Sequence, residues 1–189
     1  EVGVMCLKNF AGTTQLLRNV TRTFSLPGSS LLASLDRDWR EAVNVFESYC
    51  TEIEESFDPA LVINLTPSVS SRLITLRLGR GREVRGFAMD DFGFNADTSR
   101  WAGFLQMASA NRGSSPFNVV DLFCKVAGIN KPAPFELAEP TPEMKVAALK
   151  LLENPAPGAQ GFVGFQPGAS EDRRRWPVAY FRALGRRLW

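Results

Sequence analysis

Residues 60–78, ALVINLTPSVSSRLITLRL, decide the predicted fold of this chain. The apolar, β-branched run at 60–65, bounded by Pro59 and Pro67, is typical of a parallel strand that is buried on both of its faces. The apolar residues within 69–78 then indicate a helix that begins soon after the strand ends. A buried strand that leads through a short loop into a helix is the repeating unit of an α/β sheet.

Strands and helices alternate over the rest of the chain as well, which predicts a doubly wound α/β sheet with parallel strands. In the helix that ends near Phe57, apolar residues recur at spacings of three and four, so one face of this helix points into the core. The other predicted strands lie at residues 1–7, 23–26, 82–87 and 161–165. The predicted helices cover residues 13–20, from Asp36 or Asp38 to 57, from Ser99 onward, 118–128, 141–152 and 177–188.

Stretches rich in proline and glycine divide the predicted chain into domains. Residues 1–152 are expected to form most of one doubly wound domain, and residues 153–160 a linker. Residues 161–189 supply only one strand and one helix, which cannot bury their apolar faces alone. We therefore expect them to open a second domain.

The composition is that of a globular protein, and it excludes several kinds of active site. Of the 189 residues, 44% are apolar and 22% are charged, unlike the residues of a disordered chain. Because the chain has no histidine, it cannot form a Ser-His-Asp triad, a Cys-His dyad or an imidazole-bound metal site. Its three cysteines, Cys6, Cys50 and Cys124, are widely spaced, which favours buried thiols in a reducing cytoplasm over disulfides or a zinc site. All apolar runs are far shorter than the ~20 residues that span a bilayer.

The strongest chemical signal is the loop at residues 165–177, FQPGASEDRRRWP, between a predicted strand and a predicted helix. Gly168 and Ala169 allow a ligand to approach the backbone closely, and Ser170 can donate a hydrogen bond. The helix start offers free N–H groups to an anion, and an arginine such as Arg174 can make a charge-assisted contact with phosphate. These features predict a diphosphate site. The alternative is a solvated basic loop that caps a helix.

Positive charge gathers at the same end of the chain. Six arginines and two acidic residues give residues 171–189 a net charge of +4, whereas the whole chain carries +2. Such a cluster favours an anionic partner, which can be a phosphate, a nucleic acid or a membrane surface.

The loop at 165–177 resembles the donor-diphosphate loop of the ADP-heptose:lipopolysaccharide heptosyltransferases (glycosyltransferase family 9). In that family, a small-residue loop after a strand is followed by a basic residue, commonly lysine, two positions before Trp-Pro. Arg174 stands at that position here, which keeps the charge but changes its geometry, and Ser170 matches a serine or threonine that contacts phosphate. The resemblance extends in order along the chain and is weakest over the first fifty residues. The other matching stretches are residues 57–58, 61–65, 70–71, 82–87 and 118–128.

The resemblance implies a GT-B fold, in which two Rossmann-like domains face a cleft. The acceptor binds to the N-terminal domain and the nucleotide sugar to the C-terminal one. On this reading, Glu1 opens the second strand of the family's fold, and most of the C-terminal domain lies beyond Trp189. The family's candidate base is an aspartate in the loop after the first strand, so no base can be carried over and the catalytic residue is unknown. The 189 residues alone are therefore expected to be inactive.

The implied reaction is the transfer of heptose, or another sugar, from a nucleotide sugar such as ADP-heptose to a lipopolysaccharide core-type acceptor. It proceeds with inversion, which needs a base to deprotonate the acceptor hydroxyl, and without a metal or other cofactor. The implied partners are the nucleotide sugar and a lipid-anchored saccharide at the cytoplasmic face of the inner membrane, but no nucleic acid. Two alternatives stay open: a GT-B enzyme that uses a different nucleotide sugar, and a catalytically silent α/β binding domain.

Candidate acceptor-binding residues lie at the predicted carboxyl end of the strand at 60–65, where open α/β sheets bind ligands. They are Asn64, Thr66, Ser68 and Ser71, which could hydrogen-bond a sugar. The alternative is an ordinary polar strand end.

The neighbouring carboxylates Asp90 and Asp91 could bind a metal ion or act as acid and base. Because they have no further ligand nearby in the sequence, a solvated turn is the favoured interpretation, and no metal site is predicted.

Overall fold

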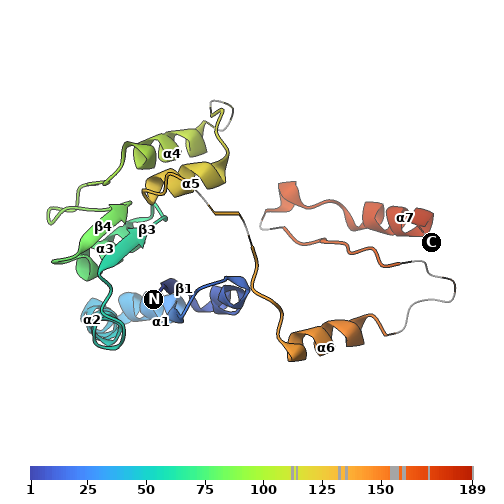
Figure 1. The fold of residues 1–189 in the computed structure, drawn as a ribbon, viewed down its shortest axis with the longest axis horizontal. Coiled ribbons are helices and arrows are strands. Elements are labelled where there is room, and N and C mark those ends of the chain that lie inside the picture. The colour runs from blue at the N-terminus through green and yellow to red at the C-terminus, as the bar shows by residue number, and fades with distance from the viewer. Residues whose placement is uncertain are drawn as a thin grey trace. The chain divides into compact units, whose positions relative to one another are not determined.

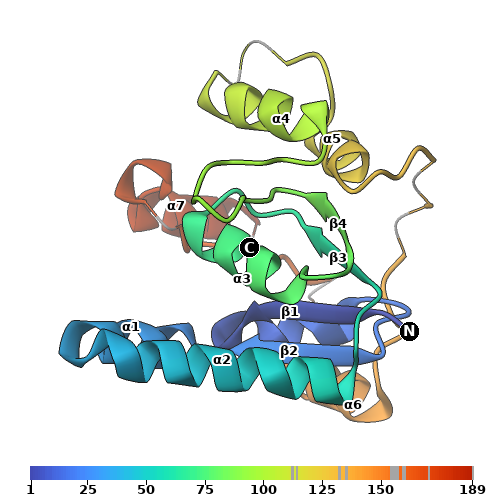
Figure 2. The same ribbon diagram turned by 90° about the vertical axis from the view of Figure 1, so that its left-hand side faces the viewer.

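The computed structural model, drawn in Figures 1 and 2, describes residues 1–111, 113, 115–131, 133, 134, 136–153, 158, 161–169 and 171–188. The chain divides into two compact units, Glu1–Glu139 and Pro140–Trp189. The predicted domain and linker boundaries at residues 152 and 160 stay a prediction.

The first unit mixes strands and helices, whereas the described elements of the second are all helical. The elements of the first unit are β1 (Gly3–Leu7), the 3₁₀ helix η1 (Lys8–Leu16), β2 (Arg22–Leu26), α1 (Gly28–Arg37), α2 (Trp39–Ser56), β3 (Leu61–Asn64), α3 (Val69–Leu78), β4 (Glu83–Gly86), α4 (Arg100–Ala110) and α5 (Val119–Val126). Those of the second unit are α6 (Pro142–Leu151), the 3₁₀ helix η3 (Asp172–Arg174) and α7 (Val178–Leu188).

The four strands form two separate parallel pairs. β1 pairs with β2, and Gly3 lies opposite Arg22; β3 pairs with β4, and Leu61 lies opposite Glu83. The predicted α/β class and parallel pairing are therefore confirmed in this coarse form. The single continuous sheet is not seen, because no hydrogen bond joins β1 to β3 within the part of the chain that the structure describes.

Local capping explains why most of the helices begin where the sequence predicts. The side chain of Asp38 accepts a hydrogen bond from the N–H of Arg40 at 2.9 Å and so caps α2. Ser99 and Thr141 cap α4 and α6 in the same way. These side chains satisfy N–H groups that have no partner inside the helix, which stabilises each start by about 1 kcal/mol.

Three predicted elements differ from the structure. The 3₁₀ helix η1 lies where a helix at 13–20 was predicted, and α1 occupies a stretch for which no helix was predicted. Residues 161–165 form no strand, although their sequence is apolar. An isolated strand leaves its backbone groups without partners, and no other strand of the second unit lies within the described residues to pair with this segment.

One core cluster joins both strand pairs to α2 and α3. Cys50 and Ile53 of α2 and Leu78 of α3 are buried at its centre. Partly buried side chains from β1, β2, β3 and the two helices surround them, namely Met5, Phe24, Phe46, Tyr49, Val62 and Ile74. Apolar contact with the same two helices therefore holds both small sheets in one unit.

A second core cluster lies where β4 ends. Phe87 is fully buried there among Ala102 and Leu105 of α4 and Leu122 and Val126 of α5. This pair of helices covers the segment that follows β4 (Figures 1 and 2).

The prediction that β3 is buried on both faces is wrong for the described structure. Val62 packs against the first core cluster, but the next residue, Ile63, is 43% exposed on the opposite face. α2 and α3 cover only one side of this strand. A charge at Ile63 is therefore not a buried charge in this unit.

We expect Leu105→Ala to lower the free energy of unfolding by about 2–5 kcal/mol, because Leu105 is 5% exposed and its loss leaves a cavity. Met107 on the same helix is 52% exposed, so Met107→Ala should change this free energy by less than about 0.5 kcal/mol. Urea denaturation of both variants measures the difference. Equal effects would show that α4 does not pack through Leu105.

The buried thiol of Cys50 predicts a loss of stability at alkaline pH. Burial raises the pKa of Cys50 from 9.0 to about 11. Between these values the unfolded chain releases the thiol proton before the folded protein does, so stability is full below pH 9 and falls as the pH rises to 11. The expected loss is on the order of 2 kcal/mol between pH 8 and 11. Cys50→Ala should flatten this slope in urea denaturation; an unchanged slope would assign the loss to other groups.

Candidate functional site

The carboxyl end of β3 is organised around the buried side chain of Asn64. Its amide nitrogen donates to the carbonyl of Phe87 at 2.8 Å and to Ser71 Oγ at 3.4 Å. Its amide oxygen accepts from the N–H of Thr66 at 2.9 Å. Asn64 therefore holds the β3–α3 loop and the segment after β4 together, and its polar atoms are engaged inside the protein.

The hydroxyls that follow Asn64 form one local network at the start of α3. Ser68 Oγ accepts from the N–H of Ser71 at 3.2 Å, which caps the helix, and Ser71 Oγ donates to the carbonyls of Thr66 and Ser68. The hydroxyl of Thr66 is exposed and makes no hydrogen bond within the described residues. The structure thus brings the four predicted acceptor-side residues together, and Thr66 is the one whose side chain is available to a ligand.

A buried ion pair fixes the segment that follows β4. Arg72 of α3 is 1% exposed, and its guanidinium bonds both to Asp97 and to the carbonyl of Ala88. Asp97 in turn accepts from the N–H of Ala88 at 3.1 Å. The guanidinium carbon also lies 5.2 Å from the ring centre of Phe87. The segment after β4 is therefore held against α3 at both Ala88 and Asp97.

Neither Arg72 nor Asp97 was predicted from the sequence as a residue of the site. The one signal in the sequence is that Arg72 precedes the buried residues Thr75 and Leu78 by three and six positions, which places a charged side chain on the buried face of the helix. A buried arginine needs an acidic partner. The partner lies 25 residues away, however, and no local pattern identifies it.

The neighbouring carboxylates Asp90 and Asp91 lie in a tight turn that displays two aromatic rings. Asp90 Oδ1 accepts from the N–H of Phe92 at 3.0 Å and of Phe94 at 2.8 Å, so this carboxylate stabilises the turn. Gly93 takes the left-handed conformation that the turn requires, with φ of 87°. Phe92 is 87% exposed at the tip.

The predicted donor loop belongs to the second unit, where aromatic contacts tie its two ends to α7. Phe165 and Trp176 both pack edge-on against Phe181, with ring centres 5.7 Å and 4.7 Å apart. α7 starts directly after Pro177, whose carbonyl accepts from the N–H of Tyr180 at 2.9 Å. The N–H groups of the first turn of α7 therefore lie beside the end of the loop.

Within this loop, each of the three consecutive arginines pairs with an acidic neighbour. Glu171 binds both Arg173 and Arg174, with 3.2 Å between its Oε1 and Arg174 Nη2. Asp172 binds Arg175, with 3.0 Å between Oδ1 and Nη1. All these side chains are substantially exposed, so the pairs are weak. An incoming phosphate would have to displace a carboxylate from Arg174.

The small residues of the loop leave room for a ligand. Gly168 is exposed, and Ala169 is half-buried, with its carbonyl accepting from Arg175 Nη2 at 3.3 Å. Ser170 lies outside the described residues. The structure therefore places Gly168, Ala169 and Arg174 in one loop next to a helix start.

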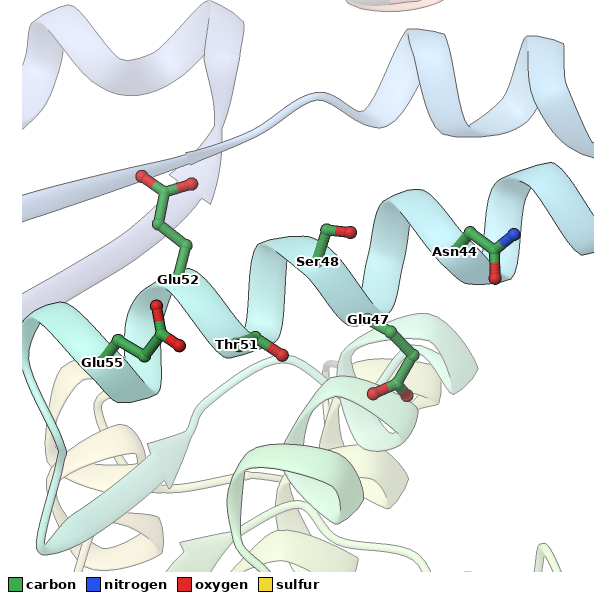
Figure 3. A pocket seen from close by; sticks show the side chains of 6 residues that line it. All are labelled: Asn44, Glu47, Ser48, Thr51, Glu52 and Glu55. Carbon is green, nitrogen blue, oxygen red and sulfur yellow. The ribbon is translucent and has the colours of Figure 1, made fainter.

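A shallow hollow runs along the polar side of α2 (Figure 3). Its lining residues are Asn44, Glu47, Ser48, Thr51, Glu52 and Glu55. The glutamates make this surface acidic, which disfavours a diphosphate. One of them, Glu47, bonds to Arg77, which also binds Glu54; the hydrogen bond from Arg77 lowers the pKa of Glu54. These ion pairs join α2 to α3, so we assign Glu47 to the packing of the two helices.

The described residues contain no group of three or more His, Cys, Asp or Glu side chains that could hold a metal ion. Among the described helices, none is both long and apolar enough to cross a membrane.

Comparison with protein-family models, with curated protein sequences and with solved structures finds no match for this chain. The resemblance to heptosyltransferases therefore stays a prediction.

The buried ion pair predicts a strong dependence of stability on both partners. Asp97→Ala leaves the charge of Arg72 buried without a partner and should lower the free energy of unfolding by about 3–5 kcal/mol. Replacing both residues, by Arg72→Met with Asp97→Ala, should recover much of that loss. Glu83→Ala, which breaks the exposed pair with Arg85, is the matched control and should cost less than about 1 kcal/mol in the same urea denaturation. A double variant as unstable as Asp97→Ala alone would contradict this account.

Proposed function

We propose that this chain belongs to an inverting glycosyltransferase that transfers heptose, or another sugar, from ADP-heptose or a related nucleotide sugar to a lipopolysaccharide core-type acceptor. One observation carries the proposal: three consecutive arginines precede Trp176 and Pro177 in a loop that ends at the start of α7. Guanidinium groups beside the N–H groups of a helix start are suited to a diphosphate, because both attract anions. The GT-B arrangement of two Rossmann-like domains is part of the same proposal.

In the proposed reaction, an acceptor hydroxyl forms a bond to the anomeric carbon as the bond from that carbon to the diphosphate oxygen breaks. The hydroxyl proton passes to a base, and the leaving nucleoside diphosphate keeps the bonding electron pair. Arg174, Gly168, Ala169 and Ser170 hold the diphosphate, and the arginine compensates the negative charge that grows on it. The proposed reaction uses no metal, and the base is not assigned.

On the acceptor side, the proposal gives the carboxyl end of β3 to the saccharide. Thr66 is the residue whose hydroxyl can reach a ligand, while Asn64, Ser68 and Ser71 set the shape of the loop through their internal hydrogen bonds. The acceptor is a lipid-anchored saccharide, so we propose a cytoplasmic enzyme at the surface of the inner membrane. The arginines of α7 would favour such an anionic surface.

A GT-B enzyme that uses a different nucleotide sugar fits the same loop, because the diphosphate is common to these donors. A catalytically silent α/β binding domain is the candidate from a different functional class. The observation that favours it is that Glu171 and Asp172 already pair with Arg173, Arg174 and Arg175. Donor binding without turnover, in the natural protein that contains this sequence, would favour the silent domain.

Arg174→Ala should weaken binding of the nucleotide sugar by about ten- to a hundredfold, because one charge-assisted contact contributes roughly 1.5–3 kcal/mol. Arg174→Lys should retain much of the binding, since a lysine keeps the charge. Glu171→Gln is the matched control: it removes the carboxylate that competes for Arg174 and should bind the donor at least as tightly as the unchanged protein. Isothermal titration calorimetry with ADP-heptose, in the full-length protein that contains this sequence, measures all three.

Arg173→Ala and Arg175→Ala test the register of the contact. If either of them weakens binding while Arg174→Ala does not, the diphosphate lies beside a different arginine. If none of the three substitutions changes the affinity, the arginine cluster does not bind the donor, and the proposal loses its main support.

A further inference from the structure

The aromatic turn, residues 89–95, holds two large apolar side chains in water on a backbone of fixed shape. It belongs to the green segment between β4 and α4 in Figure 1. The carboxylate of Asp90 accepts from the N–H groups of Phe92 and Phe94, and the N–H of Asp90 donates back to the carbonyl of Phe94 at 2.9 Å. An antiparallel bridge between the first and last residues of the turn closes its base. Phe92 is nevertheless 87% exposed and Phe94 71% exposed.

The base of the aromatic turn lies beside the candidate acceptor residues at the carboxyl end of β3. The guanidinium of Arg72 donates to the carbonyl of Pro67, at 3.3 Å from Nε, and also to the carbonyl of Ala88. Pro67 directly follows Thr66, and Ala88 directly precedes the turn. One buried side chain therefore joins the loop that carries the exposed hydroxyl of Thr66 to the base of the aromatic turn.

Polar side chains flank the two rings in the chain. Asp91 comes directly before Phe92, and Asn95 directly after Phe94. Both polar residues are exposed, and their side chains make no hydrogen bond within the part of the chain that the structure describes. A carboxylate accepts hydrogen bonds, whereas an amide both accepts and donates them. The turn therefore offers aromatic rings together with polar groups that can bind hydroxyls.

This combination of groups suits a sugar ring. A pyranose carries C–H groups on the faces of its ring and hydroxyls around its rim. The face of an aromatic ring is electron-rich and attracts the C–H groups, while the hydroxyls need donors and acceptors. Because the backbone of the turn is fixed before a ligand arrives, binding does not have to order it.

The charge of the turn decides among the ligands that aromatic rings can bind. Asp90 and Asp91 are acidic, and residues 89–95 include no lysine or arginine. A phosphate, a nucleic acid and an anionic membrane surface are all negatively charged, so the turn repels them. An uncharged sugar meets no such repulsion.

We propose that the aromatic turn binds an uncharged saccharide unit, with Phe92 and Phe94 as the stacking surface and Asp91 and Asn95 as partners of its hydroxyls. Assigning this unit to the acceptor rests on the proposed function. The turn then lies next to Thr66 on the acceptor side and selects an acceptor by the sugar unit that it presents there.

Ligand-observed NMR tests this site in the full-length protein that contains the sequence. Saturation transfer from aromatic protons of the protein is measured to the methyl glycosides of glucose, galactose and mannose, which are uncharged pyranosides. We expect transfer to the ring C–H protons of at least one of them. Phe92→Ser should raise its dissociation constant by about three- to tenfold, which corresponds to the loss of one aromatic contact. Phe92→Trp should restore binding, because it keeps an aromatic face.

Two further variants separate the turn from exposed aromatic residues in general. Phe10→Ser is the matched control: Phe10 is 53% exposed on η1, outside the turn, and its loss should leave the affinity unchanged. Asp90→Ala removes the acceptor of two N–H groups that shape the turn, so it should weaken binding of the glycoside as well. Asp90 is a positioning residue, because its carboxylate is engaged inside the turn.

Absence of transfer to all three glycosides, or an unchanged affinity in Phe92→Ser, would overturn the proposed site. Three other effects of Phe92→Ser would assign the ring to a different occupant and would also overturn it. Weaker sedimentation with vesicles of pure phosphatidylcholine would indicate a membrane. Weaker self-association at high protein concentration would indicate a second copy of the chain. A lower melting temperature would indicate that another segment of the full-length protein covers the ring.

Failure of this site and failure of the proposed sugar transfer give different results. A protein that binds a glycoside through Phe92 but does not bind ADP-heptose keeps the saccharide site and loses the proposed transfer. A protein that binds ADP-heptose through Arg174 and whose glycoside affinity does not depend on Phe92 keeps the proposed donor site and loses this one.

Discussion

The inward face of α2 is the constraint on which the rest of the first unit depends. A pair of short strands has too little apolar contact to be stable in water alone. Cys50 and Ile53 supply that contact to both pairs at once, and Leu78 of α3 completes it. Polar contacts reinforce the same arrangement, because Glu54 of α2 binds both Arg77 and Arg82. The position of β3 and of the loop that follows it is set by this packing rather than by a continuous sheet.

The carboxyl end of β3 gains its rigidity from polar groups that are fully engaged inside the protein. Asn64 joins this strand to Phe87, and Arg72 joins α3 to Ala88 and Asp97. A buried ion pair contributes little net stability, because desolvation opposes the attraction of the charges. Its directional bonds nevertheless select one arrangement of the backbone. The segment after β4 is therefore fixed beside the carboxyl end of β3.

Elements with strong local signals could be predicted from the sequence, whereas elements that depend on distant partners could not. Residues 69–78 were predicted as a helix and form α3 with the same bounds, because Ser68 caps its start and apolar residues recur along it. The predicted helix starts at Ser99 and at residue 141 are also confirmed, because Ser99 and Thr141 cap α4 and α6. Residues 161–165 have the composition of a strand, yet a strand also requires a neighbour to pair with. The burial of Ile63 was predicted wrongly for a related reason: composition reports what a strand can bury, and the elements around it decide what it does bury.

In the candidate sites, too, features set by neighbouring residues could be predicted from the sequence, whereas contacts between distant residues could not. The sequence alone placed Asn64, Thr66, Ser68 and Ser71 at a strand end, and the structure brings them together there because they are close in the chain. The sequence could not show that the amide of Asn64 donates to the carbonyl of Phe87, because that contact joins residues 23 positions apart. In the loop before α7, the sequence revealed the arginines but not their pairing with Glu171 and Asp172. Exposed pairs of this kind contribute about 0–1 kcal/mol, whereas a hydrogen bond between charged groups contributes about 1.5–3 kcal/mol. A diphosphate carries more than one negative charge and also meets the N–H groups of a helix start. Under the proposed function, it would therefore displace the carboxylate of Glu171 from Arg174, whereas in its absence the three arginines and their two acidic partners carry a net charge of +1.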